Sequence, residues 1–399
     1  MISRRAGFSK RNLLLLAACQ AIGQAANTMM FTATALSVVT FMSRHDLATL
    51  PVTLQHVGVM LSVFPAALLM QRFGRRLGFR VGSVVGMIGS STCATGLYFA
   101  SFPLMCLGGL ILGYAVASLQ MYRFAAVELV PFAMRAKAIS WVTAGGVAAG
   151  FIGPGLARFT HDKWMPLYVG TYGAMVLVHI AVFAVMSFIE FPPVRTEKIA
   201  SDQPARPLWQ IAAQPKFFLS VITAMVAFGT MSFLMSASPL AIVGCGLPHT
   251  EAHWVIFLHV MGMFVPSFFT GNLITRFGIT TVMMWGIAGL LAGIAFGLSG
   301  MTEWNFRLAL MLNGVGWNFL YIGATTLVTA TYRPSERGKT QALNDFLVFG
   351  TTASASFLAG FLQDHWGWFP LNWFSLVLVT IAVASVAGLR VVGRRTALA

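Results

Sequence analysis

Long apolar stretches alternate with short polar or basic segments along the whole 399-residue chain. Most stretches hold about 20 residues, the length with which a helix crosses the hydrocarbon layer of a bilayer. A helix also satisfies its own backbone hydrogen bonds in lipid, where no water can do so. The pattern therefore predicts an all-α membrane protein with twelve transmembrane helices. The predicted spans are 13–40, 52–71, 79–100, 102–122, 138–157, 167–190, 216–243, 252–271, 279–300, 307–330, 340–362 and 370–390.

A polar segment separates the first six spans from the last six. From Phe191 to Gln214 the chain carries charged residues and four prolines, a composition typical of a flexible connector. We therefore expect a first six-helix bundle at 1–190, a cytoplasmic linker at 191–215 and a second six-helix bundle at 216–399.

The composition excludes a soluble protein. Apolar residues make up 57% of the chain, charged residues only 9%, and the mean hydropathy is +0.77. A soluble domain carries about 25% charged residues to cover its surface. A basic N-terminus followed by an apolar run and Cys19 resembles a lipoprotein signal, but the run continues to Phe41, longer than a signal-peptide core. We therefore expect a first membrane helix there.

The basic residues set the orientation in the membrane. The formal net charge is +15, from 26 Lys and Arg against 11 Asp and Glu. With a cytoplasmic N-terminus, 22 of the 26 basic residues fall on the cytoplasmic side, as the positive-inside rule requires. The other four are Arg44, Arg158, Lys163 and Arg307. This arrangement predicts a multi-pass protein with both termini in the cytoplasm, and it explains the charge without nucleic acid as a partner.

The two halves of the sequence echo one another. Gln71-Arg72-Phe73-Gly74 after the second span is repeated as Thr275-Arg276-Phe277-Gly278 after the eighth. Arg135-Ala136-Lys137 after the fourth span is repeated as Arg337-Gly338-Lys339 after the tenth. A common offset of about 203 residues indicates a duplicated six-helix unit in parallel orientation.

These features resemble the major facilitator superfamily of secondary transporters over the whole chain. The family's loop after the second span runs Gly, three residues, Asp, a base, one residue, Gly and two bases. Here Ala67 and Gln71 replace the Gly and the Asp, while the basic turn Arg72-Phe73-Gly74-Arg75-Arg76 is retained. The resemblance implies two pseudo-symmetric bundles around a central site, lined by spans one, four, seven and ten and exposed alternately to each side.

The same resemblance implies residues that gate the cytoplasmic face. Acidic and basic residues after spans four and ten could form ion pairs there, or could simply be solvated loop charges that fix topology. The gating candidates are Gln71, Arg72, Arg75, Arg76, Glu128, Arg135, Glu336 and Arg337. Glycines in span five match an exporter pattern only in part, so the direction of transport stays open.

Polar residues at mid-span are costly in lipid and should face the protein interior. Three presumed pore-lining spans carry them on single helical faces, and span seven adds Met231 and Met235. Each residue alone could serve helix packing, but their convergence favours a substrate site. The candidates are Gln20, Gln24 and Asn27 in span one; Tyr114, Ser118 and Tyr122 in span four; and Asn313, Trp317, Asn318 and Tyr321 in span ten.

Three titratable residues could couple transport to protons. Asp345 lies about one turn into span eleven, and His179 and His259 fall at mid-span. A gating or capping role for Asp345 and a structural role for the histidines are the alternatives. No histidine or cysteine pair has metal-ligand spacing, so we expect neither a metal nor a cofactor.

A pocket of amides, hydroxyls and rings without a central charge favours a neutral, planar, hydrogen-bonding solute. The run from Gly316 to Gly323, with Asn344-Asp345-Phe346, resembles a bacterial subgroup associated with riboflavin uptake. We therefore expect a monomeric importer of riboflavin or a similar vitamin in the bacterial inner membrane, with lipid, solute and protons as partners. An exporter of hydrophobic drugs or metabolites is the alternative, and an enzyme is disfavoured because no nucleophile–base pair or metal cluster is evident.

Overall fold

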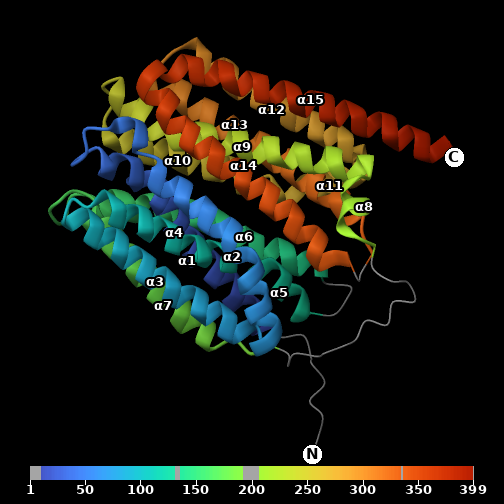
Figure 1. Cartoon of the computed structure of the whole chain (residues 1–399), viewed down its shortest axis with the longest axis horizontal. Helices are drawn as coiled ribbons and strands as arrows, with labels where there is room; N and C mark the ends of the chain where they lie inside the picture. The colour runs from blue at the N-terminus through green and yellow to red at the C-terminus, as the bar shows by residue number, and fades with distance from the viewer. Residues whose placement is uncertain (1–9, 131–134, 192–205, 334–335, 399) are drawn as a thin grey trace, which may run out of the picture.

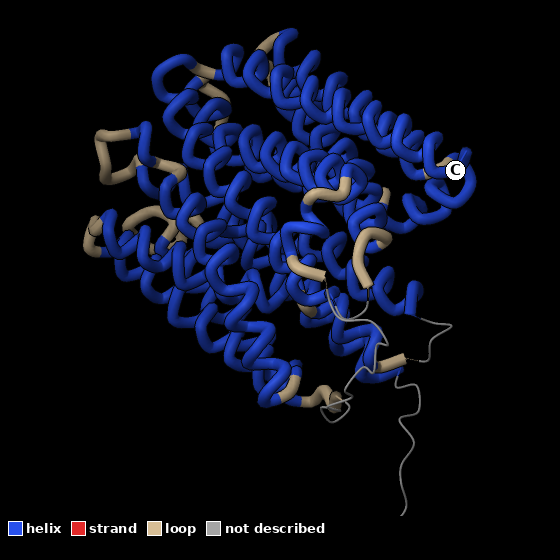
Figure 2. Tube along the Cα trace, turned by 45° about the vertical axis from the view of Figure 1, so that its right-hand side comes forward, coloured by secondary structure: helices blue, strands red, loops and turns tan. Residues whose placement is uncertain are grey.

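The computed structural model describes residues 10–130, 135–191, 206–333 and 336–398, and this part of the chain is helical with short turns and no strand (Figure 2). The all-α prediction is confirmed. The first half holds α1 (Lys10–Val38), η1 (His45–Leu47), α2 (Leu50–Phe73), α3 (Arg75–Tyr98), α4 (Phe102–Gln120), α5 (Tyr122–Glu128), α6 (Arg135–Thr160) and α7 (Val169–Ser187). The second half holds α8 (Leu208–Ala212), α9 (Pro215–Gly244), α10 (His249–Phe264), α11 (Ser267–Phe277), α12 (Ile279–Ser299), α13 (Glu303–Thr329), α14 (Arg337–Trp366) and α15 (Trp368–Leu398).

Nine helical segments of the described chain are long and apolar enough to cross a bilayer. Helices α3, α6 and α13 are not among them, since glycine, hydroxyl and amide residues dilute their apolar content. The count of twelve spans therefore stays a prediction. The predicted span 252–271 is two helices, α10 and α11, because Val265 and Pro266 interrupt it and proline cannot donate the backbone hydrogen bond of a continuous helix.

Helices from the same half of the chain pack together. In the first half α1 packs along α6, and α4 packs between α2 and α3; in the second half α9 packs against α13, α14 and α15, and α12 against α13. Figure 1 shows the first set, from blue to green, below the second set, from yellow to red. The two sets touch mainly through α2 with α14 and α6 with α10.

The sequence repeat is visible in the local geometry. Gly74 and Gly278, which end the two echoed motifs, adopt nearly the same backbone conformation, with φ of 92° and 84°. This positive φ favours glycine, which has no Cβ to clash. In both repeats the arginine two residues earlier lies over the following phenylalanine ring, at 5.3 Å for Arg72 and 5.2 Å for Arg276.

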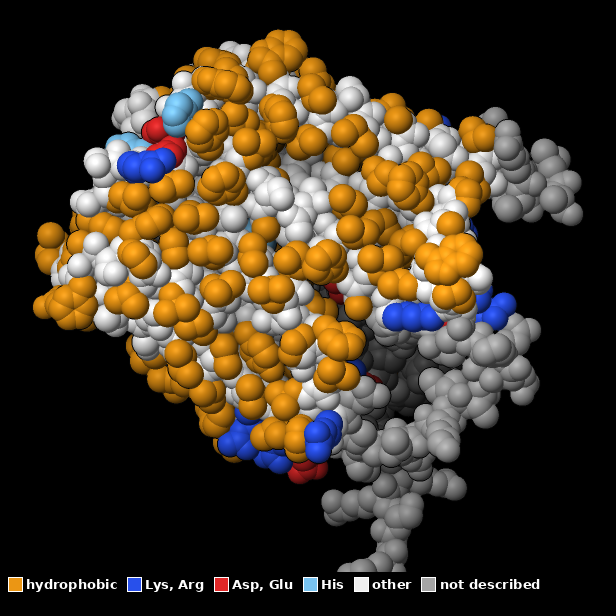
Figure 3. All heavy atoms as spheres, viewed as in Figure 1, with side chains coloured by type: hydrophobic (Ala, Val, Ile, Leu, Met, Phe, Trp, Pro, Cys, Tyr) orange, Lys and Arg blue, Asp and Glu red, His pale blue; other side chains and the backbone are white. Residues whose placement is uncertain are grey.

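Apolar side chains cover much of the lateral surface (Figure 3). Large exposed examples include Leu61, Phe64 and Trp373. An apolar surface of this extent suits lipid rather than water. Basic side chains gather at one end of the molecule (Figure 3), which we call the basic end; it carries the turn between α2 and α3 and the start of α14 (Figure 1).

The halves are joined away from the basic end. The Thr49 hydroxyl, just before α2, donates to the Ser356 carbonyl of α14 at 2.9 Å. The rings of Phe151 on α6 and Phe257 on α10 lie edge to face, 4.8 Å apart. The interface therefore closes the end that carries η1 and the turn between α6 and α7, which we call the sealed end.

Candidate functional site

A cavity of about 340 Å³ lies between the two halves. Helices α1, α2, α4 and α6 line it from the first half, and α9, α10, α11, α13 and α14 from the second. Gln20, Gln120 and Ile322 line its side toward the basic end, where Figure 3 shows the surface hollowed between basic side chains. Its volume falls in the range of small-molecule sites.

Helix α1 supplies a wall of amides. Gln20, Gln24 and Asn27 all line the cavity, together with Thr28. Their spacing of four, three and one residues places them on one face of the helix. These side chains offer both donors and acceptors and carry no charge.

Helix α13 supplies an aromatic wall. Trp317 and Tyr321, one turn apart, stack with ring centroids 5.1 Å apart and planes inclined by 18°. Phe228 of α9 meets both rings edge to face, at 5.1 Å from Trp317 and 4.7 Å from Tyr321. The indole nitrogen of Trp317 is buried without a hydrogen-bond partner in the described structure.

Asn318 also lines the cavity, but its amide is engaged elsewhere. The Asn318 nitrogen donates to the Met263 carbonyl and the Ser267 hydroxyl, both at 2.6 Å, and its oxygen accepts from Thr270 at 2.7 Å. These residues flank Pro266, so Asn318 braces the break between α10 and α11. This residue is therefore better placed to shape the site than to bind solute.

The predicted lining differs from the observed lining in two ways. The structure does not bring Tyr114 or Asn313 to the cavity: Tyr114 packs in an apolar cluster of the first half, and the Asn313 amide nitrogen donates to the Thr230 carbonyl at 3.4 Å. Six further lining residues share no obvious sequence signal and are not among the predicted ones. They are Phe31, Gln55, His56, Gln120, Phe228 and Phe264.

The reasons for these omissions differ. Phenylalanine in an apolar run looks like any lipid-facing residue, so Phe228 could not be singled out. Gln55 and His56 lie close to the start of the predicted span 52–71, but α2 begins at Leu50 and places them more than one turn into the helix. In the described chain the cavity lining holds no Asp, Glu, Lys or Arg.

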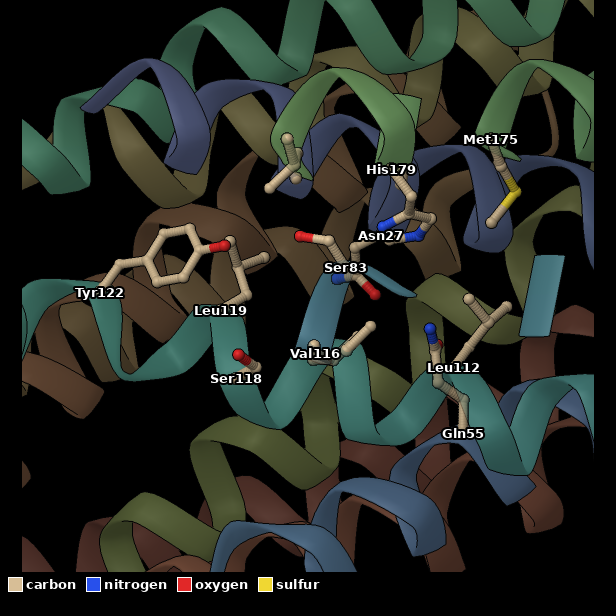
Figure 4. Close-up of a pocket in the computed structure, with 15 residues that line it drawn as sticks. Asn27, Gln55, Ser83, Leu112, Val116, Ser118, Leu119, Tyr122, Met175 and His179 are labelled. Atoms are coloured by element: carbon tan, nitrogen blue, oxygen red, sulfur yellow. The ribbon is translucent and has the colours of Figure 1, made fainter. Parts of the chain in front are cut away.

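Ser118, Tyr122 and His179 line a second, smaller space beside the cavity (Figure 4). The other two coupling candidates lie in neither lining. His259 is buried, and its Nδ1 donates to the Leu310 carbonyl at 2.8 Å. Asp345 accepts from the neighbouring Asn344 amide at 3.0 Å.

The gating candidates form contacts within each half. Arg75 and Glu128 pair at 2.9 Å, and Arg76 donates to the Ser187 carbonyl. The side chains of Gln71, Arg135 and Arg337 lie outside the described part of the structure.

Glu336 pairs with Arg206 from the predicted linker. Its carboxylate accepts from the Arg206 guanidinium at 2.7 and 2.8 Å and from the Arg333 backbone N–H at 2.9 Å. The hydrogen bonds from Arg206 hold the pKa of Glu336 well below its ordinary range. This pair fixes the end of the linker to the loop before α14.

Comparison with known proteins agrees with this architecture. The family model described as Major Facilitator Superfamily matches residues 13–248 and 221–397. A curated relative, the riboflavin transporter RfnT of Brucella anthropi, is 38% identical over 377 residues, covering 94% of both chains. The MFS-type transporter YddS of Bacillus subtilis is 27% identical, covering 94% of this chain and 90% of its own.

Solved structures share the fold at low sequence identity. A D-xylose–proton symporter superposes with a TM-score of 0.74 at 13% identity, covering 94% of this chain and 96% of its own. The nucleoside transporter NupG gives a TM-score of 0.71 at 13% identity, covering 95% and 99%.

Proposed function

The chain belongs to the major facilitator superfamily, and from this premise we propose that it imports a neutral, planar solute, riboflavin above all, across a bacterial inner membrane. The transporter is a multi-pass membrane protein whose 1–190 and 216–399 halves rock about the cavity. Both termini and the basic end face the cytoplasm, and the protein acts as a monomer. In the present conformation the cavity reaches toward the cytoplasm and the sealed end faces outward.

One observation carries the choice of solute: an uncharged cavity in which stacked aromatic rings face amides. Riboflavin has a flat, fused ring system whose edges donate and accept hydrogen bonds, and a chain of hydroxyl groups. The Trp317–Tyr321 stack suits the flat rings, and the α1 amides suit the polar edges or the hydroxyls. The riboflavin transporter at 38% identity supports the same choice.

A growth test checks this proposal. A bacterial riboflavin auxotroph without its own transporter should grow at limiting riboflavin when it expresses this chain, and should accumulate labelled riboflavin. Trp317→Ala should lose this growth rescue. Trp285→Ala is its matched control and should keep it, because Trp285 is exposed on the surface of α12. Failure of the wild type to rescue growth, at normal membrane levels, would contradict riboflavin uptake. Lower riboflavin in expressing cells than in control cells would favour the export alternative.

A further inference from the structure

A side pocket of about 20 Å³ opens beside the central cavity, inside the first half of the molecule. Helices α1, α2, α3, α4 and α7 all contribute to its wall. This volume is enough for one water molecule, provided that two to four polar groups can bind it.

Polar side chains that lack partners surround this pocket. The Ser118 hydroxyl and the Gln55 amide oxygen are fully buried without a hydrogen bond. Within the described chain, no hydrogen bond from the Tyr122 hydroxyl or the His179 ring is present either. Burying such groups unsatisfied costs free energy, so native structures satisfy them with protein atoms or ordered water.

Two glycines of α3 create the space. A Cβ on Gly86 would lie 2.5 Å from the Nδ1 of His179, and a Cβ on Gly82 would lie 2.4 Å from the Ser118 hydroxyl. Any side chain at either position would displace a polar group of the pocket. The backbone of α3 therefore leaves room for the imidazole and for the space next to it.

The side pocket is adjacent to the central cavity. Asn27 and Gln55 line both spaces, together with Val116 and Leu119. Figure 4 shows Asn27, Ser83 and His179 among the side chains that line the side pocket. Only the side chains shared by both linings therefore lie between the central cavity and the side pocket that contains His179.

We infer that the side pocket binds one water molecule between Ser118 and His179, and that His179 takes up a proton from the central cavity through it. This inference rests on the proposed function for its role in transport. The proton adds to the ring nitrogen that lacks hydrogen, the other nitrogen keeps its own, and the imidazolium returns the proton when the cavity opens to the other side. His259, whose ring is bonded to Leu310, and Asp345, which lies in neither lining, are not needed for this step.

The pocket can be tested without any solute. Full-length protein with ¹⁵N-labelled histidine is purified into lipid nanodiscs, and His179→Gln identifies the His179 signals in the NMR spectrum. We expect these signals to show exchange of magnetisation with water and to change from neutral to protonated as the pH is lowered. A His179 ring that stays neutral and shows no contact with water would overturn the inference.

The role in transport is tested in proteoliposomes with riboflavin as the probe. An inward proton gradient should accelerate uptake by the wild type, and His179→Gln should lose this acceleration while it keeps riboflavin exchange without a gradient. His45→Gln, at an exposed histidine of the sealed end, and Asp345→Asn should both keep the acceleration. Full acceleration in His179→Gln, or none in the wild type, would overturn the coupling role. If the wild type does not transport riboflavin at all, the proposed solute is wrong, and the NMR experiment still decides the pocket.

Discussion

The Tyr168 hydroxyl and the His249 Nδ1 lie 2.9 Å apart and join the two halves at the sealed end. Tyr168 has a φ of 72°, and its backbone N–H donates to the His161 carbonyl at 2.6 Å. A positive φ is costly for a residue with a side chain, so the surroundings must hold Tyr168 in this position. The rings of His161 and His253, 5.8 Å apart, add a second contact across the same boundary.

Removing this hydroxyl should make the sealed end open more often. Tyr168→Phe keeps the ring and loses a hydrogen bond with a net value of about 1 kcal/mol, which is about a fivefold change in an equilibrium constant. The measurement is the rate at which a membrane-impermeant maleimide, added outside cells, labels Met235→Cys in the cavity. Tyr98→Phe, the same change at a surface position, should leave the rate unaltered. Equal rates in Tyr168→Phe and the wild type would show that the bond does not hold the seal.

The general architecture follows from the sequence because bilayer physics constrains it strongly. Helix length, the basic-residue bias and the echo of Gly74 in Gly278 each depend on one-dimensional patterns. The break at Pro266 was missed because the apolar run continues through it. The Asn318 bonds that brace this break depend on three residues of other helices, which no spacing along α13 reveals.

Trp317→Ala should abolish riboflavin uptake while membrane insertion stays normal. The substitution removes the larger ring of the stacked pair and the edge-to-face contact with Phe228. We expect at least about a tenfold loss of uptake at limiting riboflavin, since burial of a large ring and its stacking both contribute to binding. Uptake is measured per molecule of protein in the membrane. Uptake by Trp317→Ala at the wild-type rate would show that riboflavin does not bind at Trp317.

Asn27→Ala should also abolish uptake, for a different reason. Asn27 lines the cavity and the side pocket, so its loss removes a solute partner and interrupts the route to His179. Asn12→Ala is the matched control: the Asn12 amide bonds the Glu190 carbonyl at the basic end, away from both spaces. Riboflavin exchange and gradient-driven uptake are measured separately, and retention of both by Asn27→Ala would contradict this role.

The cavity prediction was weaker than the fold prediction because several side chains of the right kind face other partners. Asn313, on the same helix as Trp317, bonds Thr230 rather than the cavity. Tyr114 has the right chemistry but packs among apolar residues. Helical spacing identifies a face, and the neighbouring helices decide whether that face meets a cavity or a core.

Asn318→Leu should lower thermal stability more than Trp317→Ala does. It removes three hydrogen bonds at the α10–α11 break, at about 1–3 kcal/mol for each buried group left without a partner; Thr270 keeps its bond to the Pro266 carbonyl. Thermal unfolding of the purified variants in detergent, followed by tryptophan fluorescence and by light scattering, provides the comparison. An unchanged unfolding temperature in Asn318→Leu would mean that these bonds do not hold the break.

Glu336→Gln should destabilise the protein at neutral pH and much less in acid. Because the Arg206 hydrogen bonds lower the pKa of Glu336 in the folded state, the ionised form stabilises the fold above the ordinary carboxyl pKa. That stabilisation is lost as the pH falls from the ordinary range toward the lowered value. The difference in unfolding temperature between wild type and Glu336→Gln should therefore shrink on acidification. Glu303→Gln, at an exposed side chain of α13, is the control, and a difference that grows in acid would contradict the assigned pKa direction.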